Sequence, residues 1–358
     1  MAGCGPYSLI DVFSGCGGMT RGFLDSGRFH AVMAIESDAD AAETYRVNFG
    51  DHVVLSPIED VATFPKADVL IGGPPCQGFS ALNRGAVGFE RRGLWREYLR
   101  ALRFSEPHAF VMENVPNLLR SAEFAEFKRR AGDLGYVLEE EVLNAADFGV
   151  PQSRKRAIVI GARVGISIQW PDSSHGDPAA ELALDRDPWR TFRDAVRGLP
   201  GEPDGKRWHR ARNPRPESVR RYEAVPSDGG NRFQMERHLD SAGLGHLVFK
   251  CWRERPGQHT DVFGRLRWDR PAVTIRTDFR PEKGRYLHPK AHRGITVREA
   301  ARCMSFEDGF IFPEDQTLTS VSRQIGNAVP PLFAAQIASA VSAALDSLVG
   351  QAADDIAA

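Results

Sequence analysis

Short apolar runs recur along the first half of the chain, and most are separated by segments whose apolar residues have helical spacing. The runs have the length of β-strands. In chain order they are Leu9 to Phe13, Ala31 to Ile35, Val53 to Leu55, Ala67 to Ile71, Ala109 to Met112, Val137 to Leu143 and Ala157 to Gly161. The expected helices cover residues 19–26, 38–48, 95–104 and 122–134. Strands that alternate with helices predict an α/β fold with a doubly wound, mostly parallel sheet. No helix separates the last two runs, so we expect one antiparallel pair at the edge of the sheet.

The pattern changes beyond Arg163. Residues 165–260 are rich in proline, glycine, arginine and histidine and contain no long periodic helix, which predicts a second, smaller and irregular domain. A short helix is expected from Val297 to Met304. Residues 331–348 are apolar at helical spacing, and we expect this last helix to pack back on the sheet. The large domain is then expected at residues 1–164 and 310–358, and the small domain at residues 165–309.

Composition narrows the class of protein. The chain has 358 residues, of which 42% are hydrophobic and 26% are charged, and this is ordinary for a globular protein with room for two domains. No apolar run in the sequence has membrane-spanning length, and Met1 to Pro6 lack the features of a signal peptide. The five cysteines form no CxxC pair, so we expect free thiols in a reducing cytoplasm and no metal site.

The charge is unevenly distributed along the chain. The net charge is only −1, but residues 190–300 contain 25 lysines and arginines against 14 aspartates and glutamates. The remainder of the chain contains 21 basic and 33 acidic residues. A basic segment of this size favours a polyanionic partner, although a solvated basic face would have the same composition.

Several expected strands end in residues that carry chemistry. The strand at Ala67 leads into Gly72-Gly73-Pro74-Pro75-Cys76, which places a thiol at the usual ligand-binding edge of an open α/β sheet. Other strands end at the glycine turn Ser14 to Gly18, at Glu36, which can accept hydrogen bonds from ribose hydroxyls, and at Glu113. Each feature alone also fits a plainer role, as a buried cysteine, a surface carboxylate or an ordinary turn.

Arg154 and Arg156 lie two residues apart. Residues with this spacing on a strand face the same side, so we expect both side chains to point into one cleft. Together with Cys76 and Glu113 they form a set suited to nucleophilic attack on a polarised ring. A structural ion-pair network is the alternative role for the two arginines.

With these residues in place, the sequence resembles the C5-cytosine DNA methyltransferases. The motifs that carry the resemblance appear in the order of that family and cover about residues 1–163 and 262–342. They are Asp11 to Gly18, Gly73 to Ser80, Glu113-Asn114-Val115, Gln152 to Arg156, Arg265-Leu266 with Pro271 and Thr274-Ile275, and Gln324 to Pro330. The intervening stretch, about 190–262, is where the family keeps its target-recognition region.

The resemblance implies a covalent mechanism. The thiolate of Cys76 would add to C6 of a cytosine, which makes C5 nucleophilic towards the methyl group of S-adenosyl-L-methionine. Glu113 would donate or share a proton at N3, Arg156 would hold the ring at O2, and Arg154 would assist. Because C6 is inaccessible in a duplex, the base would be flipped out of the double-stranded DNA.

The resemblance also implies a set of cofactor residues, and the basic segment supplies most of the candidates for contacts to DNA. The expected cofactor residues are Phe13, Gly15, Cys16, Gly17, Gly18, Glu36, Ser37, Ile58, Pro75, Leu94, Asn327, Ala328 and Val329. The expected DNA-binding residues are Gln77, Ser80, Arg207, Arg220, Arg221 and Arg232. Of these, Arg220 and Arg221 are expected at phosphates, and Arg207 and Arg232 at bases, because arginine reads guanine well in the major groove.

Two other functions remain open from sequence. A tRNA cytosine-5 methyltransferase of the same family would share the chemistry, but its Cys-Phe-Thr signature is not found in this sequence. A catalytically silent DNA-binding regulator would share the fold. For the DNA enzyme we expect a monomer in the cytoplasm that associates with the nucleoid when bound to DNA, and that has a cognate restriction endonuclease as a candidate partner.

Overall fold

A computed structural model describes residues 6–75, 93–180, 185–257, 260, 262–277 and 285–357. The predictions for Cys76, Gln77 and Ser80 therefore lie outside the described residues. The chain divides into two compact units. Unit 1 comprises Met1–Gly149, Lys155–Ser174 and Ala328–Ala358, and unit 2 comprises Val150–Arg154 and His175–Asn327. This division differs from the expected domain boundaries mainly at the carboxyl side, where unit 2 extends past residue 309 to Asn327.

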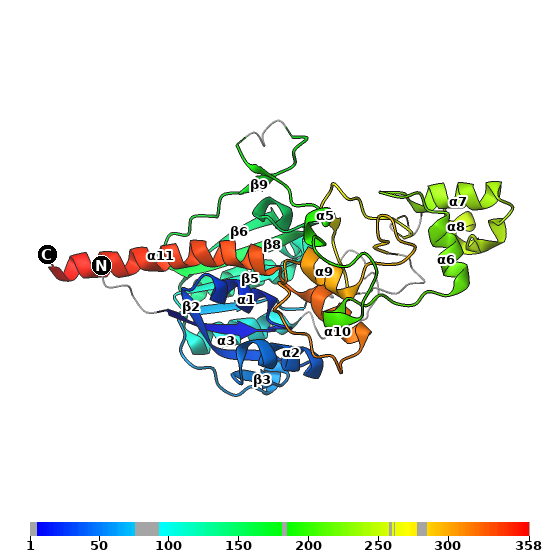
Figure 1. Cartoon of the computed structure of the whole chain (residues 1–358). Helices are drawn as coiled ribbons and strands as arrows, with labels where there is room; N and C mark the ends of the chain where they lie inside the picture. The colour runs from blue at the N-terminus through cyan, green and yellow to red at the C-terminus, as the bar shows by residue number, and fades with distance from the viewer. Residues whose placement is uncertain are drawn as a thin grey trace. The chain divides into compact units, whose positions relative to one another are not determined.

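Unit 1 is built on a seven-stranded sheet with the strand order β3-β2-β1-β4-β5-β8-β6 (Figure 1). The strands are β1 (Tyr7–Val12), β2 (Phe29–Glu36), β3 (Val53–Leu55), β4 (Val69–Gly72), β5 (Ala109–Asn114), β6 (Tyr136–Asn144) and β8 (Lys155–Arg163). β8 is antiparallel to both β5 and β6, and the other pairings are parallel. The expected mostly parallel sheet and the antiparallel pair of the last two strands are confirmed, and the antiparallel pairing of β5 with β8 is a second one that was not predicted.

The helices of unit 1 follow the predicted pattern. They are α1 (Gly18–Asp25), α2 (Ala39–Phe49), α3 (Trp95–Ser105), α4 (Ala122–Asp133) and α11 (Pro331–Ala357), with the 3₁₀ turns η1 (Ile58–Asp60), η3 (Pro116–Arg120) and η4 (Ala145–Phe148). Two of them start at side-chain caps. Asp38 accepts from the Ala41 N–H at the start of α2, and Ser121 accepts from the Phe124 N–H at the start of α4. Such caps satisfy backbone donors that the first helical turn leaves unpaired.

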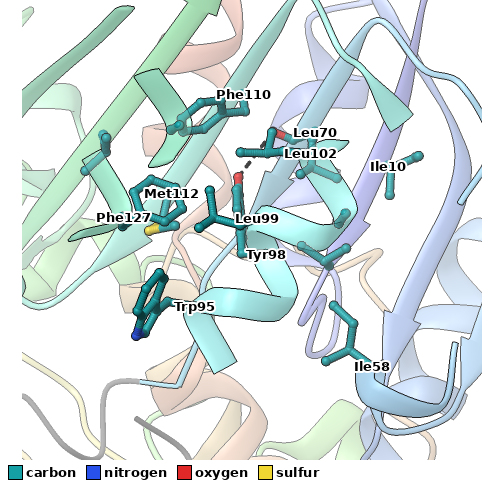
Figure 2. Close-up of a cluster of buried hydrophobic side chains, with 14 of the residues drawn as sticks. Ile10, Ile58, Leu70, Trp95, Tyr98, Leu99, Leu102, Phe110, Met112 and Phe127 are labelled. Carbon is teal, nitrogen blue, oxygen red and sulfur yellow. Dashed lines mark hydrogen bonds between the residues drawn. The ribbon is translucent and has the colours of Figure 1, made fainter. Parts of the chain in front are cut away.

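An apolar cluster packs α3 and α4 against one face of the sheet (Figure 2). Leu70 and Phe110, from β4 and β5, are fully buried there, and Phe127 of α4 packs edge-on against Phe110. Full burial of one such side chain stabilises a fold by about 1.5–3 kcal/mol. Tyr98 places its hydroxyl in the same cluster and donates a 2.9 Å hydrogen bond to the Val111 carbonyl oxygen.

The last helix was expected to pack back on the sheet, and in the structure it packs on the first helix. α11 runs beside α1 (Figure 1), and a Cβ atom at Gly22 would lie 2.4 Å from the Pro331 carbonyl oxygen, so only glycine fits this close contact. The hydroxyl of Tyr7 donates to Asp346 Oδ1 at 2.7 Å. Among the described residues one helical stretch, Leu318–Leu348, is long and apolar enough to cross a membrane, but 67% of its apolar window is buried, as in a core helix.

Unit 2 contains more helix than the sequence predicts. Its helices are α5 (Phe192–Ala195), α6 (Pro216–Glu223), α7 (Arg232–Ser241), α8 (Lys250–Glu254), α9 (Val297–Cys303) and α10 (Leu318–Asn327), with η6 (Lys206–Trp208) and η7 (Gly245–Leu247). Its strands are short pairs, β7 (Gln152–Ser153) with β11 (Ala272–Val273) and β9 (His175–Gly176) with β10 (Asp187–Pro188). A second apolar core, which includes Tyr222, Met235, Trp252 and Phe263, holds α6, α7 and α8 together.

The sequence predicted no long periodic helix in this segment, and α6 and α7 are short, with 8 and 10 residues. On α7 the buried positions are Arg232, Met235 and Leu239, which do have helical spacing. Because the first of these buried positions is an arginine, the sequence does not show a complete set of apolar residues at helical spacing. Asn231 and Gln234 form a capping box at the start of the helix.

Candidate active site

The turn between β1 and α1 contains two glycines with different roles. Gly15 has φ +55°, and a Cβ atom placed there would meet nothing within 4 Å. Gly17 has φ +87°, and a Cβ atom there would lie 2.3 Å from the Phe49 ring. Gly17 therefore allows the turn to pack on α2, whereas Gly15 borders open space that a ligand can enter. The Ser14 N–H donates to the Ile35 carbonyl oxygen at 3.0 Å and fixes the turn to β2.

Glu36, the last residue of β2, is bonded to this turn. Its Oε2 accepts from the Gly15 N–H at 2.8 Å and its Oε1 accepts from the Asp38 N–H at 2.7 Å. Burial raises the pKa of Glu36, and these two hydrogen bonds partly oppose that rise. A carboxylate offers about four acceptor sites, so Glu36 retains capacity for a ribose hydroxyl as well. Ser37, the next residue, is exposed.

Two other titratable residues at this turn are buried. Burial raises the pKa of Cys16 to about 12, so its thiol is protonated at neutral pH and packs as a small apolar group. Asp11 accepts a 2.5 Å hydrogen bond from the Thr20 hydroxyl, and burial raises its pKa to about 7. Sequence reasoning gave Asp11 no role, although a carboxylate inside an apolar strand was a visible signal.

Glu113 and Arg156 form a close ion pair where β5 ends and β8 begins. Arg156 Nε lies 2.7 Å from Glu113 Oε1, and the two side chains are only 14% and 11% exposed. The antiparallel register places Asn114 opposite Ala157, which brings the two charged residues together. Arg156 thus fixes one carboxylate oxygen and orients the other.

Asn114 connects this pair to the residues before Cys76. Its Nδ2 donates to the Pro74 carbonyl oxygen at 2.9 Å, and its Oδ1 accepts from the Val115 N–H at 2.9 Å. A Cβ atom at Gly73 would lie 3.1 Å from Glu113 Oε2, so the glycine lets the carboxylate approach the backbone. The structure therefore places Gly73 and Pro74 beside Glu113, immediately before Pro75 and Cys76 in the chain. Sequence reasoning included Asn114 in a motif but assigned it no role.

The prediction that Arg154 and Arg156 lie on one strand and face the same side is wrong. β7 ends at Ser153 and β8 begins at Lys155, so Arg154 and Arg156 do not alternate along one strand. Arg154 is 1% exposed and donates from Nη1 to the Ile275 carbonyl oxygen and from Nη2 to the Gly326 carbonyl oxygen, both at 3.0 Å. Its guanidinium group binds backbone within unit 2.

Comparison with known proteins decides the class of enzyme. The profile of the C-5 cytosine-specific DNA methylase family matches residues 7–343. The chain belongs to this family. It is 35% identical to the Type II methyltransferase M1.HphI of Haemophilus parahaemolyticus, over 94% of this chain and 87% of that protein. It is 31% identical to the Type II methyltransferase M.NgoFVII of Neisseria gonorrhoeae, over 93% of this chain and 86% of that protein.

Solved structures share the fold of this C-5 cytosine-specific DNA methylase. The methyltransferase EhMeth of Entamoeba histolytica matches with a TM-score of 0.60 at 16% identity, over 96% of this chain and 99% of that one. The Dnmt2 methyltransferase of S. pombe matches with a TM-score of 0.59 at 18% identity, over 96% and 99%. The family and its relatives establish the chain as a DNA cytosine-C5 methyltransferase, as the sequence motifs implied.

The remaining cofactor residues predicted for the methylase are spread over both units. Gly18 begins α1, and Ile58 is buried at the start of η1. Arg100 holds η1 in place, because its Nη2 donates to the Ile58 carbonyl oxygen at 2.6 Å, and this contact had no signal in the sequence. Leu94 packs at the border of the apolar cluster of unit 1. Ala328 and Val329 belong to unit 1, and Asn327 is the exposed last residue of α10 in unit 2.

The structure corrects two of the predicted DNA-binding residues of the methylase. Arg221 is buried, donates from Nε to the Leu247 carbonyl oxygen at 2.7 Å, and lies 4.2 Å from the Phe249 ring centre. Arg232 is 0% exposed and donates from Nη2 to the Pro256 carbonyl oxygen at 2.6 Å. Side chains held inside the core of unit 2 do not reach DNA. Arg207 and Arg220 are exposed.

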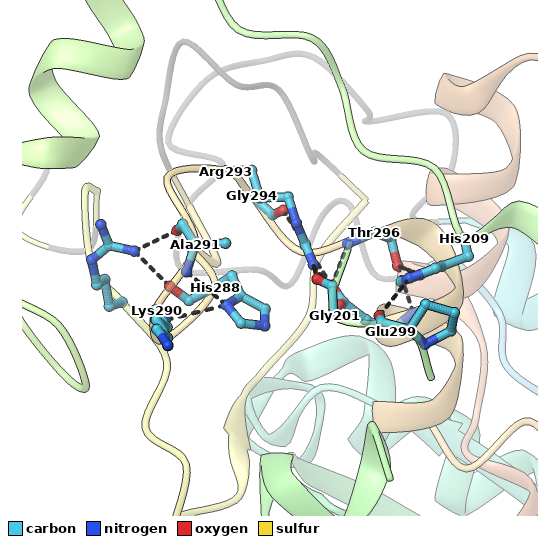
Figure 3. A network of polar contacts seen from close by, with 11 residues as sticks. Gly201, His209, His288, Lys290, Ala291, Arg293, Gly294, Thr296 and Glu299 are labelled. Carbon is cyan, nitrogen blue, oxygen red and sulfur yellow. Dashed lines mark hydrogen bonds and ion pairs between the residues drawn. The ribbon is translucent and has the colours of Figure 1, made fainter. Parts of the chain in front are cut away.

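A network of polar side chains surrounds the start of α9 in unit 2 (Figure 3). Glu299 accepts two hydrogen bonds from Arg293, both at 2.9 Å, and one from the Thr296 N–H at 2.7 Å. His209 lies 3.0 Å from the Thr296 hydroxyl. Within the described ranges, no group of three or more histidine, cysteine, aspartate or glutamate side chains is arranged to hold a metal ion.

Proposed function

We propose that this methylase acts on a flipped-out cytosine of double-stranded DNA through a covalent bond between Cys76 Sγ and C6. The thiolate adds to C6, and the electron pair of the C5–C6 double bond is displaced, so that negative charge is shared between C5 and, through C4, N3. Glu113 donates or shares a proton at N3 as negative charge develops there, and Arg156 holds the ring at O2. After C5 has been methylated, a base removes the C5 proton, the thiolate leaves C6, and the N3 proton returns to Glu113.

The observation that carries this proposal is the Glu113–Arg156 pair beside the Pro74 carbonyl. Asn114 holds that carbonyl at 2.9 Å, and Arg156 holds the carboxylate at 2.7 Å. The Glu113 carboxylate is fixed in position and largely shielded from water. Cys76 follows Pro74 closely in the chain, so we infer that this carboxylate can transfer a proton to a ring bound beside the thiol.

The methyl donor is proposed to be S-adenosyl-L-methionine, which supplies an electrophilic methyl group. The residues of unit 1 fit this donor. Gly15 borders open space on the turn between β1 and α1, and Glu36, which can accept further hydrogen bonds, is bonded to the same turn. Gly15 admits the ligand, Glu36 accepts from its ribose, and Phe13 and Ile58 supply apolar surface.

Several finer features are part of the same proposal. The named relatives are Type II methyltransferases, which supports a cognate restriction endonuclease for the same DNA sequence. The enzyme is proposed to act as a monomer in the cytoplasm and to be associated with the nucleoid when bound to DNA. Arg207 and Arg220 remain proposed DNA contacts.

The first prediction tests the covalent step. Duplex DNA that carries 5-fluorocytosine should trap a denaturant-resistant adduct with the wild-type enzyme, because fluorine does not leave C5 as a proton does. Cys76→Ser should abolish both the adduct and methyl transfer, yet bind S-adenosylhomocysteine as wild type does in calorimetry. Cys251→Ser is the matched control, since Cys251 is an exposed cysteine on α8.

Three outcomes would contradict the proposal. A Cys76→Ser enzyme with near wild-type turnover would rule out the covalent mechanism. Methylation of a tRNA but of no DNA would favour the tRNA enzyme. Binding of DNA by the wild-type protein with no methylation of any sequence would favour the silent regulator.

A further inference from the structure

The positive charge of unit 2 divides into two groups of arginines. One group is buried within the fold and donates to backbone carbonyl oxygens. Its members are Arg154, Arg221, Arg232, Arg265, Arg293 and Arg298. These side chains are unavailable to a partner, so contacts to DNA must come from the second group, on the surface.

Three arginines of unit 2 surround one pocket. Arg210, Arg212 and Arg285 line a small pocket, and apolar side chains, including Leu287, Ile295 and Val297, form its wall. Pockets of mixed charge and apolar surface are typical of small-ligand or anchor sites.

Arg210 and Arg212 differ in the groups that surround their positive charges. Arg210 pairs with Glu314 and donates from Nε to the Gly205 carbonyl oxygen at 2.8 Å, so its position is fixed and its charge is balanced. Arg212 donates from Nη2 to the neutral hydroxyl of Thr319 at 2.7 Å. Its Nε is buried and has no hydrogen-bond partner in the part of the chain that the structure describes. A buried, unsatisfied N–H on a charged group favours an anionic acceptor.

We propose that the pocket of Arg210, Arg212 and Arg285 binds one backbone phosphate of the DNA duplex. Guanidinium groups bind phosphate oxygens through paired N–H donors. Backbone contacts of this kind fix the position of a protein on DNA without reading its sequence. The assignment rests on the proposed function, because it takes duplex DNA as the partner.

The test measures how DNA binding depends on salt. Binding of a mixed-sequence duplex is followed by fluorescence anisotropy over a potassium chloride series, without methyl donor, for wild type and for Arg212→Ala, Arg285→Ala and the double variant. On B-DNA each neutralised phosphate contributes about −0.9 to the slope of log affinity against log salt. We expect each single variant to flatten the slope by about one, and the double variant to flatten it by no more than a single variant, because both arginines share one phosphate.

Controls separate charge from folding. Arg197→Ala removes one positive charge from an arginine of unit 2 that is 81% exposed and lies outside the pocket, and it should leave the slope unchanged. Arg212→Lys and Arg285→Lys retain the charge and should retain most of the slope. All variants should keep the thermal unfolding midpoint of wild type. A further arm replaces chloride by inorganic phosphate at equal ionic strength, which should weaken DNA binding by wild type more than by the double variant.

Each contrary result has a defined meaning. An unchanged slope in the double variant, with wild type still forming the 5-fluorocytosine adduct, would overturn the pocket and leave the proposed function intact. A slope flattened by about two in the double variant would show two separate phosphates and overturn the shared site. If wild type forms no adduct and methylates no DNA, the proposed function itself fails.

Discussion

Asp11 in unit 1 and Glu299 in unit 2 are both buried carboxyl groups, but their surroundings act on them in opposite directions. Asp11 lies in β1 among apolar residues and has the Thr20 hydroxyl as its donor, and burial raises its pKa to about 7. Burial also acts to raise the pKa of Glu299. There the hydrogen bonds and charge of Arg293, with the Thr296 N–H, outweigh burial and leave the pKa below its usual value.

The same contrast extends to how each unit is held together. The strands of unit 1 pair with one another and satisfy their own backbone groups, so apolar side chains can fill the space between sheet and helices. Unit 2 consists largely of short helices and loops, and these leave buried carbonyl oxygens that need donors. Arginine offers five N–H donors, and Arg265 uses them on the carbonyl oxygens of Tyr222, Val225, His288 and Ala291. Much of the basic surplus of residues 190–300 is therefore structural.

The largest effect is expected at Arg265. Arg265→Met keeps an apolar side chain in the space but removes the donors for four buried carbonyl oxygens, and we expect it to lower the stability of unit 2 by about 3–5 kcal/mol. The matched change in unit 1 is Leu70→Met, which conserves volume and should cost less than about 1.5 kcal/mol. Denaturant unfolding with hydrogen exchange resolved by unit measures both. Equal losses of stability in Arg265→Met and Leu70→Met would contradict the proposed difference between the two units.

The next effect separates two neighbouring arginines. Arg156→Ala should lower the single-turnover methylation rate by about 10²–10³-fold, because it frees the Glu113 carboxylate and removes a donor to the ring, with little change in thermal stability. Arg154→Met should instead lower the thermal unfolding midpoint and increase hydrogen exchange in unit 2. If Arg154→Met reduces the rate without any loss of stability, the role first predicted for it from the sequence is restored.

The smallest expected effect, for a step of one pH unit, is a pH dependence of opposite sign in the two units. Asp11 has a folded-state pKa of about 7 against an ordinary value of 3.8. The folded state therefore holds an extra proton between these values, and stability should fall as pH rises through that window, by at most about 1.4 kcal/mol per pH unit. Asp11→Asn, which can still accept from Thr20, should remove this slope.

Glu299 should behave in the opposite way. Its pKa is lowered from 4.5, so its stabilising contribution is present above that value and is lost as pH falls through the lower folded-state pKa. Glu299→Gln should remove the acid-side loss while leaving the slope above pH 5 as in wild type. Urea unfolding from pH 3 to 8 measures both carboxyl groups. An Asp11→Asn enzyme with the wild-type slope between pH 4 and 7 would contradict the assignment.

The sequence predicted unit 1 far better than unit 2, and the two cores explain why. Strands such as Val69–Gly72 are continuous apolar runs because both faces of a parallel sheet are buried. Such runs can be recognised directly in the amino-acid sequence. On α6 and α7 the buried faces include Arg221 and Arg232, which appear polar in the sequence. A composition rich in arginine therefore did not distinguish a buried scaffold from a DNA-binding face.

The candidate site shows the same limit. Glu113 and Arg156 belong to motifs that point to chemistry, and the register of β5 and β8 brings them together. The hydrogen bond from Asn114 to Pro74 joins residues 40 positions apart, and no local pattern encodes such a contact. The assumption that Arg154 lies on a strand with Arg156 failed because the strand is interrupted at Arg154 itself.

The contact of α11 with α1 has a consequence for synthesis of the enzyme. Tyr7 and Asp346 are hydrogen-bonded although they are 339 positions apart, and Gly22 packs directly on the backbone at Pro331. During translation the first strand and helix leave the ribosome long before their packing partner exists. The glycine turn that precedes α1 therefore reaches its final support only when the last helix has been made. A chain that is interrupted before α11 lacks this support, so α1 keeps an uncovered packing face at Gly22.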